Sequence, residues 1–208
     1  MPASGSGWIH EIKHDGFRMM ARRDGAGGRL FTRHGNDFAR RFSPAVAATT
    51  ALPGRSFLID GEAIITNGDG RAVFELIQHK RHGGDAVLVA FDLIELGGHD
   101  SRREPIEHRK ARLATLVRSP HPGIGLNEYY EDDGEVVFQH ACKLGWEVSC
   151  RSPQSLGCSL HWVKVKIPKA PAVIGIMIAA LLVHFLPSRL AASRRRGSAE
   201  PRGARRRY

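Results

Sequence analysis

The chain has 208 residues, of which 42% are hydrophobic and 25% are charged. This length suits one well-buried domain with an appendage, and the composition excludes a disordered or fibrous protein. The formal net charge of +10 indicates a polyanionic partner, although eight arginines of the last 21 residues supply most of it.

Short apolar runs separated by turn residues predict an α+β fold in which antiparallel sheets are flanked by helices. Turn pairs such as Asp24-Gly25 and Gly27-Gly28 favour hairpins over a doubly wound parallel sheet. The predicted strands are Trp8–Lys13, Phe17–Arg23, Arg29–Arg33, Phe57–Thr66, Ala86–Leu93, Ile124–Tyr130 and His161–Lys166.

Two amphipathic helices stand out, and Pro105 suits the first turn of the earlier one. In the later one, the residues expected to face inward are Val136, Val137, Ala141 and Leu144. The predicted helices, two of them short, are Ser43–Ala51, Val73–Lys80, Glu104–Val117 and Asp133–Leu144.

The end of the chain has a different character. Residues 172–186 are mostly apolar, lie between two prolines, and precede the arginine-rich tail. A membrane-spanning helix needs about 20 apolar residues. Three interpretations therefore stay open: a membrane anchor, a helix covered by the domain or a partner, and an extension without fixed order.

Cysteine usage and the first residues bear on location. The three cysteines, Cys142, Cys150 and Cys158, are odd in number and lack the spacing of a zinc site. Residues 1–7 are short and polar, unlike a secretory signal. We expect reduced thiols and a cytoplasmic protein.

The segment at residues 11–18, EIKHDGFR, carries the clearest chemical signal. Lys13 ends a predicted strand, Gly16 lets the chain turn, and Asp15 and Arg18 project near the same pocket. A lysine becomes a nucleophile when burial or nearby cations lower its pKa, because only the neutral amine attacks phosphorus. Taken alone, such a segment is more often a surface strand and turn with scattered charges.

Four further motifs follow in order: TRHG at 32–35, IDGEA at 59–63, AFDL at 90–93 and WVKVK at 162–166. Together with EIKHDGFR they resemble the motifs of ATP-dependent DNA ligases and of the related RNA ligases and capping enzymes. The helix and strand after Tyr130 resemble those of bacterial end-joining ligases. The resemblance implies an adenylation (nucleotidyltransferase) domain over residues 8–168, with 169–208 as an appendage.

The resemblance also implies roles for single residues. Lys13 is expected to attack the α-phosphate of ATP and carry AMP, and Phe91 to stack on adenine. Mg²⁺ is the expected cofactor, with Glu62 and Glu147 as its ligands. The residues expected to bind nucleotide are Glu11, Ile12, Arg18, Arg33, Glu62, Phe91, Lys164 and Lys166, and the cations among them would offset phosphate charge.

The sequence departs from this family in two places. The segment EVSCR at 147–151 is two residues shorter than the corresponding ligase strand, and Cys150 stands where the family has a lysine. Ligases continue into an oligonucleotide-binding β-barrel, whereas residues 169–208 show no β pattern. We therefore expect no such barrel, and the composition of this end indicates a shifted reading frame or a gene remnant.

Three functions are open at this stage. The first is an ATP-dependent DNA ligase that seals nicked double-stranded DNA in repair or recombination, alone or with a separate DNA-binding or end-joining protein. The second is a degenerate homologue that binds nucleotide without completing ligation. The third is a basic protein that binds nucleic acid or a membrane surface, with residues 172–186 as the membrane contact. The intact Lys13, Asp15, Gly16 and Glu62 favour the first, whereas Cys150 and the expected absence of the barrel favour the second.

Overall fold

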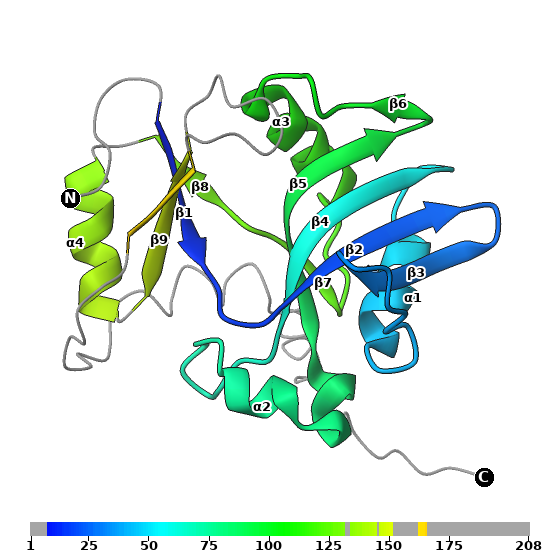
Figure 1. The fold of residues 1–208 in the computed structure, drawn as a ribbon, viewed down its shortest axis with the longest axis horizontal. Coiled ribbons are helices and arrows are strands. Elements are labelled where there is room, and N and C mark those ends of the chain that lie inside the picture. Colours follow the sequence, from blue (N-terminus) through cyan, green and yellow to red (C-terminus); the bar gives the residue numbers. More distant parts are fainter. Residues whose placement is uncertain (1–7, 132–133, 145, 152–161, 166–208) are drawn as a thin grey trace, which may run out of the picture. The chain divides into compact units, whose positions relative to one another are not determined.

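A computed structural model describes residues 8–131, 134–144, 146–151 and 162–165 (Figure 1). The chain divides into two units, Met1–Ile176 and Met177–Tyr208, and all described residues belong to the first. Expectations for 172–186 and for the arginine-rich tail therefore fall outside the described residues. Among the helices that are described, none is long and apolar enough to cross a bilayer.

The described strands form two sheets, which confirms the predicted α+β class. The larger sheet has the order β3-β2-β4-β5-β6, with β7 paired to β5. Its strands are β2 (Phe17–Asp24), β3 (Gly27–Thr32), β4 (Phe57–Ile64), β5 (Val87–Leu96), β6 (His99–Asp100) and β7 (Ile124–Leu126). The β5–β7 pair is parallel, and the other pairs are antiparallel.

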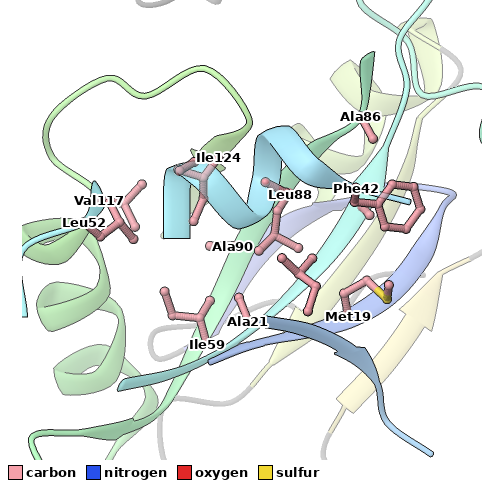
Figure 2. Packing of buried hydrophobic residues seen from close by; sticks show 14 of the residues in the cluster. Met19, Ala21, Phe42, Leu52, Ile59, Ala86, Leu88, Ala90, Val117 and Ile124 are labelled. Carbon is pink, nitrogen blue, oxygen red and sulfur yellow. The ribbon is translucent and has the colours of Figure 1, made fainter. Parts of the chain in front are cut away.

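The main hydrophobic core lies on one face of this larger sheet, under α1 (Ser43–Ala51) and α3 (Ile106–Leu116). Side chains alternate between the two faces of a strand. Figure 2 shows core residues from the strands and from the positions that flank α1 and α3: Met19, Ala21, Ile59, Leu88, Ala90, Ile124, Phe42, Leu52 and Val117. The alternate residues of β2, β4 and β5 face away from this core.

The smaller sheet has the order β10-β9-β1-β8, and all its pairs are antiparallel. Its strands are β1 (Ile9–Lys13), β8 (Tyr129–Tyr130), β9 (Glu147–Arg151) and β10 (Trp162–Val165). Helix α4 (Gly134–Leu144) packs on it through Ala141 and Val137. The expectation that Val136 faces inward was wrong, because its side chain is 49% exposed. Adjacent helical residues differ by about 100° in direction, so Val136 falls outside this narrow contact face.

Two predicted elements are divided in the structure. The expected strand Ile124–Tyr130 is two strands in different sheets, because β7 pairs with β5 and β8 pairs with β1. The expected helix Val73–Lys80 is α2 (Phe74–Gln78), followed by the 3₁₀ helix η1 (Lys80–Asp85). An apolar pattern predicts extended or helical backbone, but it carries no mark of where the chain leaves one sheet for another.

Candidate active site

Lys13 is the last residue of β1 and lies opposite Glu147 of β9. Its Nζ is 2.8 Å from Glu147 Oε2, and both side chains are about one-third exposed, at 30% and 37%. The antiparallel register brings these two residues together, because directly opposed residues of neighbouring strands point to the same face. The expected nucleophile and an expected metal ligand are therefore an ion pair in this structure.

The glycine of the K-x-D-G segment brings a second carboxyl group to the same place. The backbone N–H of Gly16 donates to the Glu62 carboxylate. A Cβ at Gly16 would lie 2.1 Å from the carbonyl oxygen of Ala63, so only glycine allows this approach to β4. Burial raises the pKa of Glu62 to about 7, and the positive charges of Lys13 and Arg18 partly oppose that rise.

Arg18 of β2 lies opposite Glu62 of β4 and is held by a third acidic residue. Its Nη2 donates to Asp60 Oδ2 at 2.6 Å, and its Nε donates to Oδ1 at 3.1 Å. The guanidinium carbon lies 5.6 Å from the centroid of the Phe91 ring. A two-pronged pair with a buried carboxylate thus orients Arg18 over an aromatic face.

Phe91 sits at a β-bulge. Gly61 pairs with Ala90 and Asp60 pairs with Asp92, so Phe91 is the extra residue on β5. Bulges change the direction of a side chain and are common beside active sites. Phe91 is buried with the Arg18 guanidinium over its ring, and its stacking on adenine stays a prediction.

Glu11 accepts hydrogen bonds from two residues, Lys110 and Asn127, that the sequence motifs did not indicate as part of the site. Its Oε1 accepts from Lys110 Nζ at 2.6 Å and from Asn127 Nδ2 at 3.2 Å. Asn127 Nδ2 also donates to the carbonyl oxygen of Ile12 at 3.1 Å. Glu11 and Lys110 are 1% and 2% exposed, so this is a buried ion pair whose carboxylate lies two residues before Lys13 on β1. Nucleotide contacts by Glu11 and Ile12 stay predictions.

The remaining predicted cations are less closely placed. Arg33 follows β3, is exposed, and donates from Nε to His34 Nε2 at 3.4 Å. Lys164 lies opposite Ser149 in the strand register, and Lys166 lies outside the described residues. Their nucleotide contacts also stay predictions.

The register of β9 bears on the cysteine that stands in place of a lysine. Cys150 lies opposite His10 and Val163, whereas Glu147 lies opposite Lys13. The two β9 residues are three positions apart, so they occupy alternate positions of the pleat.

The carboxylates suit a hard cation only together with a bound anion. Within residues 8–131, 134–144, 146–151 and 162–165, no group of three or more His, Cys, Asp or Glu side chains could hold a metal. Mg²⁺ commonly takes one or two carboxylates and completes its shell with phosphate oxygens and water. Glu62 and Glu147 both interact with Lys13, so they fit an ion that a nucleotide would share.

A family model described as "ATP dependent DNA ligase domain" matches residues 2–143. The multifunctional non-homologous end joining protein LigD of Pseudomonas aeruginosa is 32% identical over 145 residues, covering 67% of this chain and 17% of that protein. A probable DNA ligase of Streptomyces coelicolor is 36% identical over 121 residues, covering 53% of this chain and 24% of that protein. The chain thus spans less than a quarter of the length of these two relatives.

Solved structures share the fold. The ligase domain of LigD from M. tuberculosis superposes with a TM-score of 0.66 at 24% identity, covering 80% of this chain and 57% of that one. A mycobacterial DNA ligase D complexed with ATP and MES gives a TM-score of 0.63 at 24% identity, covering 79% and 58%. At this identity the superposition establishes the fold.

Proposed function

The chain belongs to the ATP-dependent DNA ligase domain family, and from that premise we propose that it transfers AMP from ATP to Lys13 and then to a DNA 5′-phosphate. The observation that carries the proposal is the setting of Lys13. Its amine is 2.8 Å from Glu147 Oε2, and its positive charge lowers the pKa of Glu62. The next strand along the chain, β2, carries Arg18.

In the first step, the neutral Lys13 amine attacks the α-phosphorus of ATP after its ammonium proton leaves to solvent. A nitrogen–phosphorus bond forms, the bond from phosphorus to the bridging oxygen breaks, and its electron pair departs with pyrophosphate. The nitrogen then loses a second proton to solvent, which leaves the phosphoramidate. Arg18 is held rigidly by Asp60, so its charge would stabilise the transition state without reorganisation. Glu147 holds the ammonium in place before the attack.

Mg²⁺, held by Glu62 and Glu147 together with phosphate oxygens, would supply charge neutralisation. An added cation favours the ionised form of Glu62, which burial disfavours in the free protein. Nucleotide and metal would therefore recruit this carboxylate as they bind.

The later steps act on nicked double-stranded DNA. A 5′-phosphate oxygen attacks the lysine-bound AMP, which forms a phosphoanhydride and returns the amine. The 3′-hydroxyl of the nick then attacks the activated phosphate, loses its proton, and expels AMP. This sequence would place the chain in DNA repair or recombination, with or without a separate end-joining partner.

The test is covalent labelling of the purified protein by ATP carrying the label at the α-phosphorus, in the presence of Mg²⁺. The same ATP labelled at the γ-phosphorus should leave the protein unlabelled, because that phosphate departs with pyrophosphate. Lys13→Ala should abolish the label, and Lys13→Arg should also fail, since a guanidinium stays protonated.

Lys143→Ala is the matched control, because Lys143 is an exposed lysine on α4 that takes part in none of the site contacts described above. It should keep the wild-type label. Label that survives Lys13→Ala would refute the assignment of the nucleophile.

A further inference from the structure

Asn127 lies where the chain crosses from the larger sheet to the smaller one, between β7 and β8. Its backbone N–H donates to the carbonyl oxygen of Ala90 at 2.7 Å, next to the bulge at Phe91. Its side chain donates to Glu11 Oε1 and to the carbonyl oxygen of Ile12, and it also hydrogen bonds to His14. One buried amide therefore contacts the residues on both sides of Lys13.

Lys110 of α3 makes a parallel connection. Its Nζ donates to Glu11 Oε1 at 2.6 Å and to the carbonyl oxygen of Phe91 at 3.0 Å. The same ammonium lies 5.3 Å from the centroid of the Tyr129 ring. A single buried charge thus joins the strand of the nucleophile, the bulge of β5 and the short strand β8.

We infer that Lys110 and Asn127 are positioning residues for adenylyl transfer, because they fix the strand that carries Lys13 against the bulge that carries Phe91. The inference rests on the proposed function and extends it to two residues outside the motifs. Neither side chain has a described contact with Lys13 itself, so both would act through Glu11 and the backbone of β1 and β5.

Replacement of Lys110 or Asn127 should lower the rate of adenylyl transfer more than the affinity for ATP. Attack on phosphorus requires the amine in line with the leaving group, and a misplacement of about 1 Å can cost on the order of a hundredfold in rate. A loosely held Lys13 should leave the proposed nucleotide contacts of Arg18 and Glu62 in place. A general loss of structure would instead lower the fraction of protein that reacts.

The neighbouring residue on α3 provides a matched control. Arg109 is 1% exposed and forms a buried ion pair with Asp92 at 2.9 Å. It therefore shares the helix, the burial and the type of bond with Lys110. Its carboxylate partner belongs to β5, whereas the partner of Lys110 belongs to β1.

The experiment compares Lys110→Met, Asn127→Asp and Arg109→Met with wild type by single-turnover labelling over a range of ATP concentrations, well below each melting temperature. In Lys110→Met and Asn127→Asp the saturating rate should fall at least about tenfold, with the half-saturating ATP concentration within about threefold of wild type. Arg109→Met should melt at a lower temperature but keep a saturating rate within about threefold of wild type. Lys110→Arg, which retains a donor cation, should recover part of the loss.

Amide hydrogen exchange supplies a readout that does not depend on activity. Exchange in a peptide covering residues 9–13 should quicken in Lys110→Met and Asn127→Asp more than in Arg109→Met, with β4 as the internal reference. Wild-type saturating rates in these two variants, or unchanged exchange in β1, would overturn the positioning role alone. Absence of label in the wild-type protein would overturn the proposed function and the catalytic consequence together, whatever the exchange result.

Discussion

The ionisation of Glu62 makes the free energy of unfolding depend on pH. Its folded-state pKa of about 7 lies above the ordinary value of 4.5, so its contribution to stability is complete below about pH 4.5 and is lost as the pH rises through 7. Glu62→Gln should therefore raise the free energy of unfolding at pH 8 by about 1–3 kcal/mol and change it little at pH 4. Urea denaturation at the two pH values measures this, and an equal effect at both would contradict it.

Gly16 is expected to be irreplaceable for a steric reason. Gly16→Ala would place a methyl group 2.1 Å from a β4 carbonyl oxygen, so the β1–β2 connection must move. We expect a loss of about 1–3 kcal/mol in stability together with loss of labelling. Gly25→Ala is the control, because a Cβ there meets nothing within 4 Å, and it should change stability by less than about 1 kcal/mol. Thermal melts and labelling of both variants check the pair, and equal effects would refute the steric account.

Lys13, Arg18 and Glu62 could be picked out from the sequence because each belongs to a short motif with its own order and spacing. Lys110 and Asn127 could not, because a lysine in an amphipathic helix and an asparagine after a strand both read as surface residues. Their partner Glu11 is 99 and 116 residues away, respectively. A buried charged residue can be predicted only when its partner is known. A single sequence does not show which distant residues pair.

Helix α4 packs on the smaller sheet through a narrow face. Ala141 is buried against β9 and β1, whereas Val136, five positions earlier, is half exposed. Ala141→Asp should bury an unpaired charge, lower the melting temperature strongly, and reduce labelling because Glu147 follows the helix. Val136→Asp should leave both nearly unchanged, and similar losses in the two variants would show that the packing face has been misassigned.

Most strands were predictable to within a few residues, since alternation and turn residues mark their ends. The bulge at Phe91 and the switch at Asn127 were not, because both depend on which strand lies opposite. Phe91 lies at the first of these points, and Asn127, at the second, contacts the residues on both sides of Lys13. The sequence therefore indicated several side chains that lie close together around Lys13, but not the backbone geometry that brings them together.

Labelling and nick sealing should differ in this chain. Self-adenylation needs the surroundings of Lys13, whereas sealing also needs a surface that grips the duplex and aligns its ends. We expect labelling by the 208-residue chain with weak sealing that declines further above about 0.2 M salt, since phosphate contacts weaken with ionic strength. A gel assay on nicked duplex across a salt series measures this, and rapid, salt-tolerant sealing would contradict it.

A chain cut before Ala172 tests the appendage separately. We expect it to retain labelling and its melting temperature and to be less prone to aggregate, because an exposed apolar run favours association. A large fall in melting temperature with loss of labelling would show that the segment is part of the domain core.

The pairing of β1 also sets an order of events during synthesis. Its described partners are Tyr129–Tyr130 and Glu147–Arg151, so the strand that carries Lys13 leaves the ribosome more than 110 residues before the strands that complete its sheet. The strand pairs β2–β3 and β2–β4 join residues that are much closer in the sequence, so these pairs can form first. The nascent chain would thus acquire its arginine and Glu62 in place while Lys13 still lacks Glu147, and the ability to react with ATP would arise at the final stage of folding.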